Sequence, residues 1–233
     1  VVLAGGLGTR LRPFTRSVPK PLVEVAGKPM IDRIIDGFRA FGCEDFLVTT
    51  GYRADQLRRH FEAGREGLRV RFVDNGELDG TAIWWRTLKG TMEAPFVLTC
   101  CDVLADVDYP AVAKEHALRG DAMTLVAYRR TRVVPGGAVQ VGPDGTFEGF
   151  SSRCTTDEVI YAGVAVVEPR VFSLEGGGDN PLTLQNLLES CRREGWRVGV
   201  HVVEGSAFRD MGSISALVRA DRALREAEGA IPR

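Results

Sequence analysis

The chain has 233 residues, of which 44% are hydrophobic and 26% are charged, and its formal net charge is −1. This length and hydrophobic content predict a globular chain with a sizeable core. The near-zero net charge predicts no general attraction to nucleic acid or to anionic membranes. The sequence contains no run of eighteen apolar residues, so no membrane-spanning helix is expected. We therefore expect neither a nucleic acid nor a membrane as a partner.

The five cysteines predict thiols rather than a disulfide framework or a zinc site, because the count is odd and no Cys-x-x-Cys spacing occurs. Cys100 and Cys101 are adjacent, so in a strand their side chains point to opposite faces and do not pair. Free thiols are typical of a reducing compartment, and we expect a cytoplasmic protein.

The amino terminus opens with an apolar run over residues 1–4 that predicts a buried strand, followed by Gly5, Gly6 and Gly8. Backbone without side chains bends sharply and lets its N–H groups converge on an anion. Two common phosphate loops are excluded. No Gly-x-x-x-x-Gly-Lys-Ser/Thr string follows, and Leu11 stands where a dinucleotide fingerprint needs its third glycine.

Basic residues follow these glycines at short spacing. Arg10 and Arg12 offer fixed charge and bidentate donors that suit phosphate, and Lys20 stands between Pro19 and Pro21, which restrict the local backbone. A glycine-rich turn, two arginines and a braced lysine together predict a polyphosphate site. The alternative, a tight turn with surface arginines, does not account for the Pro-Lys-Pro.

Strands and helices alternate through the first half of the chain. Apolar spacing predicts helices over 30–41, 53–63, 81–89 and 105–118, the last starting near Asp108, and strands over 46–50, 69–73 and 95–101. Thr81 is a candidate N-cap. Such alternation predicts a parallel sheet whose faces are covered by helices.

The second half is richer in strands. Strands are expected over 122–128, 138–141, 146–150, 159–167 and 197–203, with helices over 182–193 and 213–226. Pro143-Asp144-Gly145 predicts a hairpin turn between two of these strands. The whole pattern predicts an α/β fold with a Rossmann-like mixed, mostly parallel sheet and helices on both faces.

Two aspartates are candidate ligands for Mg²⁺, a hard cation that binds carboxylates and nucleotide phosphates. Asp102 follows an apolar strand, at the sheet edge where ligands collect, and Asp210 lies between a strand and the last helix. Taken alone, Asp102 is better explained as a helix N-cap or turn aspartate. The alternative for Asp210 is a loop aspartate near the N-terminus of the last helix, where the helix dipole favours it. Asp106 and Asp108 are nearby alternatives, as metal ligands or as caps.

Residues 3–13, with Thr15 and the Pro19-Lys20-Pro21 segment, closely resemble the signature of the sugar-1-phosphate nucleotidylyltransferases. The resemblance extends over nearly the whole chain in consistent order. It implies the nucleotide-diphospho-sugar transferase type of fold, with one domain over 1–233. A nucleotide-binding half would extend to about residue 120, and a sugar-binding half would cover about 121–233.

The resemblance also implies roles for single residues. Arg10, Lys20 and Asp102 would be catalytic, and Asp102 and Asp210 would hold Mg²⁺. The nucleotide would be bound by Leu3, Ala4, Gly5, Gly6, Gly8, Thr9, Arg10, Gly80, Thr81 and Asp102. The physical account agrees, because two anions must meet in line at the α-phosphorus and positive groups must offset the charge that builds there.

The sugar-phosphate site is expected at Lys20, Gly137, Ser152, Arg153 and Gly163. One departure stands out here, because the family has Glu-Lys where this chain has Ser152-Arg153. Arg153 can still hold a phosphate, but Ser152 does not replace a carboxylate that accepts two hydroxyls. An unusual sugar is therefore expected.

The implied reaction joins a nucleoside triphosphate and a sugar 1-phosphate into a nucleotide-sugar and pyrophosphate, for activated-sugar biosynthesis. We favour GTP with a mannose- or heptose-like sugar, as in short mannose/heptose-1-phosphate guanylyltransferases, and a possible homodimer. Two alternatives stay open. One is a nucleotidyltransferase that acts on a non-sugar phosphate such as phosphocholine, for which an aromatic box is needed and Trp84-Trp85 is the nearest match. The other is a non-catalytic nucleotide-binding regulatory module.

Overall fold

The structure, a computed structural model, describes residues 1–76, 83–130, 134–154, 158–174, 183–205 and 208–229. The chain separates into two compact units, and both are built from more than one segment. The first unit comprises Val1–Asp74, Cys100–Asp106 and Phe208–Arg233, and the second comprises Asn75–Thr99 and Val107–Ala207.

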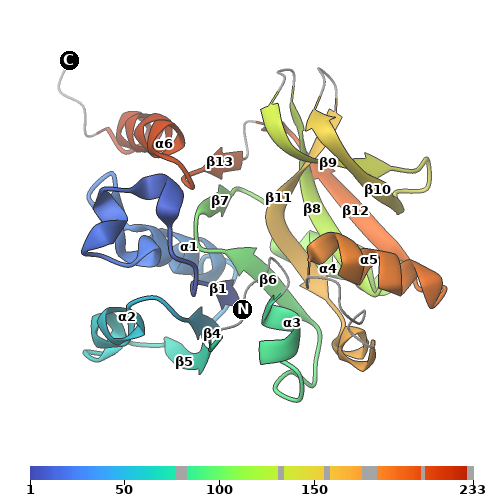
Figure 1. Cartoon of the computed structure of the whole chain (residues 1–233), viewed down its shortest axis with the longest axis horizontal. Helices are drawn as coiled ribbons and strands as arrows, with labels where there is room; N and C mark the ends of the chain where they lie inside the picture. The colour runs from blue at the N-terminus through green and yellow to red at the C-terminus, as the bar shows by residue number, and fades with distance from the viewer. Residues whose placement is uncertain (77–82, 131–133, 155–157, 175–182, 206–207, 230–233) are drawn as a thin grey trace. The chain divides into compact units, whose positions relative to one another are not determined.

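Three parallel strands form the sheet of the first unit. β1 (Val2–Leu3) pairs with β4 (Asp45–Thr50), which in turn pairs with β5 (Arg69–Asp74). The three strands lie side by side in Figure 1. β4 is buried along nearly its whole length, as expected for a central parallel strand. Two of these strands, β4 and β5, confirm the expected strands at 46–50 and 69–73.

Helices α1 (Met30–Arg39) and α2 (Ala54–Phe61) confirm two of the expected helices. The apolar residues of α1 recur at helical spacing, and all of Met30, Ile31, Ile34, Ile35 and Phe38 are buried. The helix starts directly after Pro29, which is its N-cap.

A cluster of buried side chains joins residues near the start of the chain to residues near its end. It includes Leu11, Val25, Met30 and Met211, together with residues of helix α6 (Ile214–Ala227). Short elements surround it: the 3-10 helices Thr9–Leu11, Phe14–Arg16 and Lys20–Leu22, and the two-residue strands β2 (Glu24–Val25) and β3 (Lys28–Pro29). The cluster therefore fixes the glycine-rich segment against the carboxyl-terminal helix.

One small antiparallel pair was not expected from the sequence. β7 (Val103–Ala105) pairs with β13 (Phe208–Asp210), and the two lie together in Figure 1. The helix expected to start near Asp108 is confirmed, since α4 spans Tyr109–Arg119 with Asp108 as its N-cap. Ala105, the first residue of the mostly helical stretch expected over 105–118, instead ends β7. Three-residue strands carry too little alternation to be recognised from sequence.

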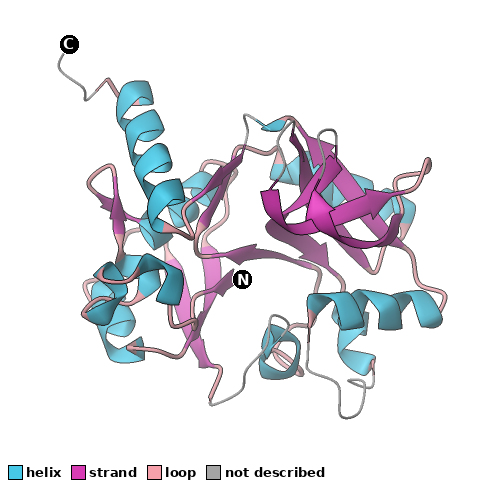
Figure 2. Ribbon diagram, turned by 45° about the horizontal axis from the view of Figure 1, so that its top comes forward, coloured by secondary structure: helices cyan, strands magenta, loops and turns pink. Residues whose placement is uncertain are grey.

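The second unit is rich in antiparallel strands, drawn in magenta in Figure 2. β11 (Glu158–Val167) pairs antiparallel with β6 (Phe96–Cys100), β8 (Met123–Arg130) and β9 (Val134–Val141). β9 pairs antiparallel with β10 (Phe147–Cys154), and β12 (Val198–Val203) runs parallel to β8. Its helices are α3 (Ile83–Thr87), α4, α5 (Leu184–Arg193) and the 3-10 helix Pro169–Ser173.

The hairpin turn expected at residues 143–145 is confirmed. Gly142 N–H donates to the carbonyl of Thr146 at 2.9 Å. Both flanking strands extend beyond the expected ranges, because the β9–β10 ladder continues to the pair Cys154–Val134 through residues whose own strand propensity is low.

Trp84 and Trp85 are buried, and the indole N–H of Trp85 donates to the Val171 carbonyl at 2.6 Å. They are packing residues in this unit, as buried Trp with a satisfied N–H usually is. Thr81, the candidate cap before them, lies outside the described residues.

Across the described ranges, no helix is both long and apolar enough to cross a membrane. The single-domain expectation, with its two halves, stays a prediction.

Asp108 is the N-cap of α4, since its carboxylate accepts from the N–H of Ala111 at 2.9 Å. We predict that Asp108→Ala lowers the free energy of unfolding by about 1 kcal/mol in urea denaturation, because one helix-terminal N–H loses its acceptor. Asp106→Ala is the matched control. Asp106 is also exposed, so its variant is expected within about 0.5 kcal/mol of wild type. Equal loss in both variants would contradict the capping role.

Candidate active site

The glycine-rich segment leaves β1 and is fixed by hydrogen bonds to the neighbouring strand and its loop. The N–H of Ala4 donates to the buried hydroxyl of Thr49 at 3.1 Å, and the N–H of Tyr52 donates to the carbonyl of Gly5 at 3.3 Å. These bonds hold the start of the loop at the carboxyl end of a parallel strand, where α/β sheets bind ligands.

Gly8 is required for the next turn. Its φ is +63°, a conformation that side chains disfavour, and a Cβ there would lie 2.9 Å from Thr15 Cγ2 and 3.0 Å from Lys20 Cβ. Thr15 is 2% exposed, and its hydroxyl donates to the carbonyl of Gly8 at 2.8 Å. Thr15 therefore joins the loop to the Lys20 segment.

Lys20 begins a 3-10 helix directly after Pro19, and its ammonium pairs with the Oδ2 atom of Asp102. The two side chains are only 13% and 12% exposed. Burial by itself lowers the pKa of Lys20, but the charges of Cys101, once ionised at high pH, and of Asp102 outweigh it, so the pKa lies above its ordinary value. Lys20 is thus a cation at neutral pH.

Arg10 is a second cation near the same carboxylate, but it is mostly exposed. Its Nη2 atom lies 3.8 Å from Asp102 Oδ2, while 70% of its side chain is exposed. At that distance and exposure the pair contributes little stability, so the guanidinium is available to bind an incoming anion.

Asp210 is brought to Asp102 by the β7–β13 pair. Asp210 pairs with Val103, the residue after Asp102, and the N–H of Met211 donates to the Asp102 carbonyl at 2.8 Å. The Asp210 carboxylate accepts from the N–H of Gly212 at 2.8 Å. Neither the helix cap nor the simple turn suggested for Asp102 describes its carboxylate, which is bound to Lys20.

Gly212 leaves open the space between the two carboxylates. A Cβ at this position would collide with Asp102 Oδ2 and would lie 3.0 Å from Asp210 Oδ1 and 3.1 Å from Arg10 Nη2. Three charged groups from distant parts of the sequence, those of Arg10, Asp102 and Asp210, therefore converge on one point without a side chain. Gly212 follows Asp210 by two residues in the sequence, but this spacing does not reveal which atoms meet there.

The residues present fit a magnesium ion. Mg²⁺ is usually held by one or two carboxylates together with substrate phosphates, rather than by a complete protein cage. Asp102 and Asp210 supply two, and the described residues contain no group of three or more His, Cys, Asp or Glu that would hold a metal by themselves. Cys101 does not compete, since burial raises the pKa of its thiol to about 12 and keeps it neutral.

The predicted sugar-phosphate residues other than Lys20 belong to the second unit. Gly137 lies in β9, Ser152 and Arg153 lie in the partner strand β10, and Gly163 lies in β11, which also pairs with β9. Gly163 has a φ of +73° and sits where the β11–β8 register shifts. These strands are neighbours, so the structure gathers the four positions. Gly80 and Thr81 lie outside the described residues.

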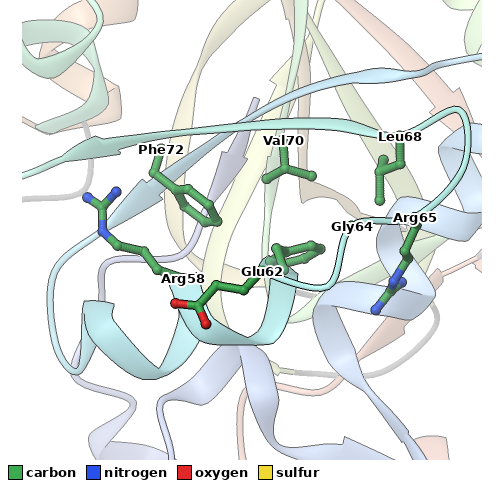
Figure 3. A pocket seen from close by; sticks show the side chains of 8 residues that line it. Arg58, Glu62, Gly64, Arg65, Leu68, Val70 and Phe72 are labelled. Atoms are coloured by element: carbon green, nitrogen blue, oxygen red, sulfur yellow. The ribbon is translucent and has the colours of Figure 1, made fainter.

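A separate cavity of about 350 Å³ lies between α2 and β5, with Phe72, Val70 and Leu68 along the strand (Figure 3). Its two arginines already have partners within the protein. Arg65 donates to Asp32 at 2.7 Å, and Arg58 stacks on the Phe72 ring at 5.1 Å. This cavity contains none of the residues that the sequence singled out.

Residues 1–227 match the family model described as "Nucleotidyl transferase". The chain belongs to the nucleotidyl transferase family. The expected family is thereby confirmed, and the matched region contains the glycine-rich loop, Lys20 and both aspartates.

Curated relatives of this nucleotidyl transferase chain carry sugar-1-phosphate nucleotidylyltransferase names. It is 31% identical over 179 residues to the mannose-1-phosphate guanylyltransferase catalytic subunit beta of Drosophila pseudoobscura pseudoobscura, covering 74% of this chain and 48% of that protein. It is 25% identical over 217 residues, or 84% of either chain, to a probable glucose-1-phosphate cytidylyltransferase of Bacillus subtilis. The chain spans about half the length of the first of these relatives.

A solved structure confirms the fold of this nucleotidyl transferase. HddC from Yersinia pseudotuberculosis, complexed with GMP-PN, superposes with a TM-score of 0.77 at 19% identity, covering 96% of this chain and 97% of that one. The expected α/β fold of the nucleotide-diphospho-sugar transferase type is therefore correct.

We predict that Gly212→Ala lowers the free energy of unfolding by about 1–3 kcal/mol, because its methyl group forces Asp102 or Asp210 aside. Urea denaturation measures this. Gly37→Ala is the matched control in α1, where a Cβ meets nothing within 4 Å, and it is expected to be neutral or up to about 1 kcal/mol more stable. A Gly212→Ala protein as stable as wild type would show that the carboxylates do not converge there.

Proposed function

We propose that this chain transfers a nucleotidyl group from a nucleoside triphosphate to a sugar 1-phosphate, releasing pyrophosphate. The observation that carries the proposal is the convergence of Arg10, Asp102 and Asp210 beside Gly212, with Lys20 paired to Asp102, in a chain of the nucleotidyl transferase family. Two cations beside two carboxylates suit the meeting of two phosphates around a metal ion.

The chemical step is an in-line displacement. An oxygen of the sugar phosphate forms a bond to the α-phosphorus, and the bond from that phosphorus to the bridging oxygen of the β-phosphate breaks, so pyrophosphate leaves with the electron pair. The sugar phosphate is already an anion, and no general base is required. This agrees with a site built from arginine, lysine and aspartate rather than histidine.

We propose separate roles in this reaction for the residues of the site. Backbone N–H groups of the Gly5–Thr9 loop and the exposed Arg10 would hold the triphosphate, and Lys20 would bridge the α-phosphate and the sugar phosphate. Asp102 and Asp210 would hold Mg²⁺, which supplies charge neutralisation and orientation at the phosphates. We also propose that Leu3, Ala4, Gly80 and Thr81 bind the nucleotide.

For the sugar 1-phosphate we propose Arg153 as the cation at its phosphate, with Ser152, Gly137 and Gly163 around the sugar. Guanidinium suits phosphate because it offers paired donors in a plane. A serine hydroxyl donates and accepts singly, so the sugar is expected to differ from one that is held by a carboxylate.

GTP and a mannose- or heptose-like sugar are our preferred substrates. The name of the Drosophila relative and the GMP-PN in the Yersinia structure support guanine, while the Bacillus relative is named for cytidylyl transfer. We further propose a cytoplasmic homodimer, with the free thiols Cys43, Cys101 and Cys191 as support for a reducing compartment.

The first experiment is pyrophosphate release with Mg²⁺ and each of GTP, UTP, CTP, dTTP and ATP, against hexose and heptose 1-phosphates and phosphocholine. We expect release with one guanine–sugar pair. Release with phosphocholine alone would favour the non-sugar alternative. Triphosphate binding without release from any pair would favour the regulatory module.

We predict that Lys20→Ala lowers turnover at least ~10²-fold without unfolding the protein, because one donor to the transition state is lost. Lys28→Ala is the control, since Lys28 forms an ion pair with Asp36 in the same unit and lies outside the proposed site. Circular dichroism checks the fold. Turnover near that of wild type would contradict the role of Lys20, and Asp102→Asn is expected to abolish metal-dependent release.

A further inference from the structure

We propose that Lys20 acts as a stand-in for the metal ion in the free protein, so that a divalent cation binds Asp102 well only when nucleotide phosphates draw Lys20 away. The inference rests on the proposed function, because it uses the same carboxylates and the same phosphates. It adds a coupling between nucleotide and metal that the reaction itself does not require.

One oxygen atom, Oδ2 of Asp102, would have to serve both Lys20 and a bound cation. Asp102 Oδ2 is the atom paired with Lys20, and it is also the Asp102 atom nearest the Cβ position of Gly212, which Asp210 Oδ1 approaches as well. A cation held by both aspartates would therefore need the oxygen that Lys20 occupies. The ammonium and the metal compete for one ligand.

Burial makes this competition strong. Both side chains of the pair are nearly inaccessible to water, so attraction within the pair, and repulsion between an ammonium and a second cation, are screened much less than at the surface. Arg10, 3.8 Å from the same oxygen, adds to the positive charge that an incoming ion meets. A free protein in this state is expected to bind divalent cations weakly.

Lys20 can leave without a change of fold. Its backbone is fixed by Pro19, Pro21 and the packing of its Cβ near Gly8, but its ammonium stands at the end of a flexible alkyl stem. The same packing places the base of the lysine against the glycine-rich loop, where the triphosphate is proposed to bind. Phosphate oxygens there would offer the ammonium a new partner and free Asp102 for the metal.

Reciprocity follows from this exchange. If nucleotide strengthens metal binding by releasing Asp102, then metal strengthens nucleotide binding by the same factor. Removing the ammonium should remove the obstacle to metal and most of the coupling together. A purely structural ion pair predicts the opposite, because its loss would only destabilise the site.

The test is Mn²⁺ binding to the nucleotide-free protein, by calorimetry and by electron paramagnetic resonance. We expect Lys20→Met to bind Mn²⁺ at least ~10-fold more tightly than wild type, within the usual range of coupling between two ligands. Lys28→Met is the matched control, since it removes the same charge from another lysine–aspartate pair of this unit, and its affinity should equal that of wild type.

Two further measurements distinguish a change in metal affinity from a loss of folding. Lys20→Met and Lys20→Gln should melt at a lower Tm than wild type, because Asp102 loses its partner, and Mn²⁺ should raise the Tm of both more than that of wild type. The double variant Lys20→Met/Asp102→Asn should lose the added affinity. Affinity in both Lys20 variants that is no tighter than in wild type would overturn the proposal.

Failure of the two proposals can be distinguished. Suppose that Lys20→Met binds Mn²⁺ more tightly and that no substrate pair releases pyrophosphate. This result would support the competition between Lys20 and the metal for Asp102 and would overturn the proposed reaction. Normal pyrophosphate release by wild type, with unchanged Mn²⁺ affinity in the Lys20 variants, would overturn the competition and leave the reaction standing.

Discussion

The ion pair between Lys20 and Asp102 is the interaction on which the site depends. Its partners are 82 residues apart in sequence and mostly shielded from water. Removing two charges from water is costly, and the cost is offset only when the geometry of the pair is held closely. The rest of the first unit supplies that geometry: the parallel strands position the glycine-rich loop, and the β7–β13 pair fixes the aspartates.

Positions without side chains are as important here as the charged groups. Gly8 lets Thr15 and the Lys20 segment pack against the loop, and Gly212 leaves room between Asp102 and Asp210. In both places a methyl group would move a functional residue by contact alone. The absence of a side chain at these two glycines therefore determines where the charged groups lie, while the Arg10 side chain is mostly exposed.

The second unit has a different role. Its antiparallel strands gather Gly137, Ser152, Arg153 and Gly163, which are the positions proposed for the sugar phosphate. Strand ladders tolerate exchange of the side chains that they present. The departure from the family's Glu-Lys at Ser152-Arg153 therefore lies in a strand, where a change of side chain is tolerated.

The sequence by itself determined the glycine-rich loop, the braced Lys20 and the α1 helix, because local spacing and turn chemistry specify them. It also indicated Asp102 and Asp210, but only as single carboxylates at the ends of strands. Their convergence at Gly212 required the pairing of two three-residue strands more than a hundred residues apart, which no local pattern encodes. The tertiary structure alone decided that Lys20 binds the carboxylate proposed for the metal, because that contact depends on burial and on long-range packing.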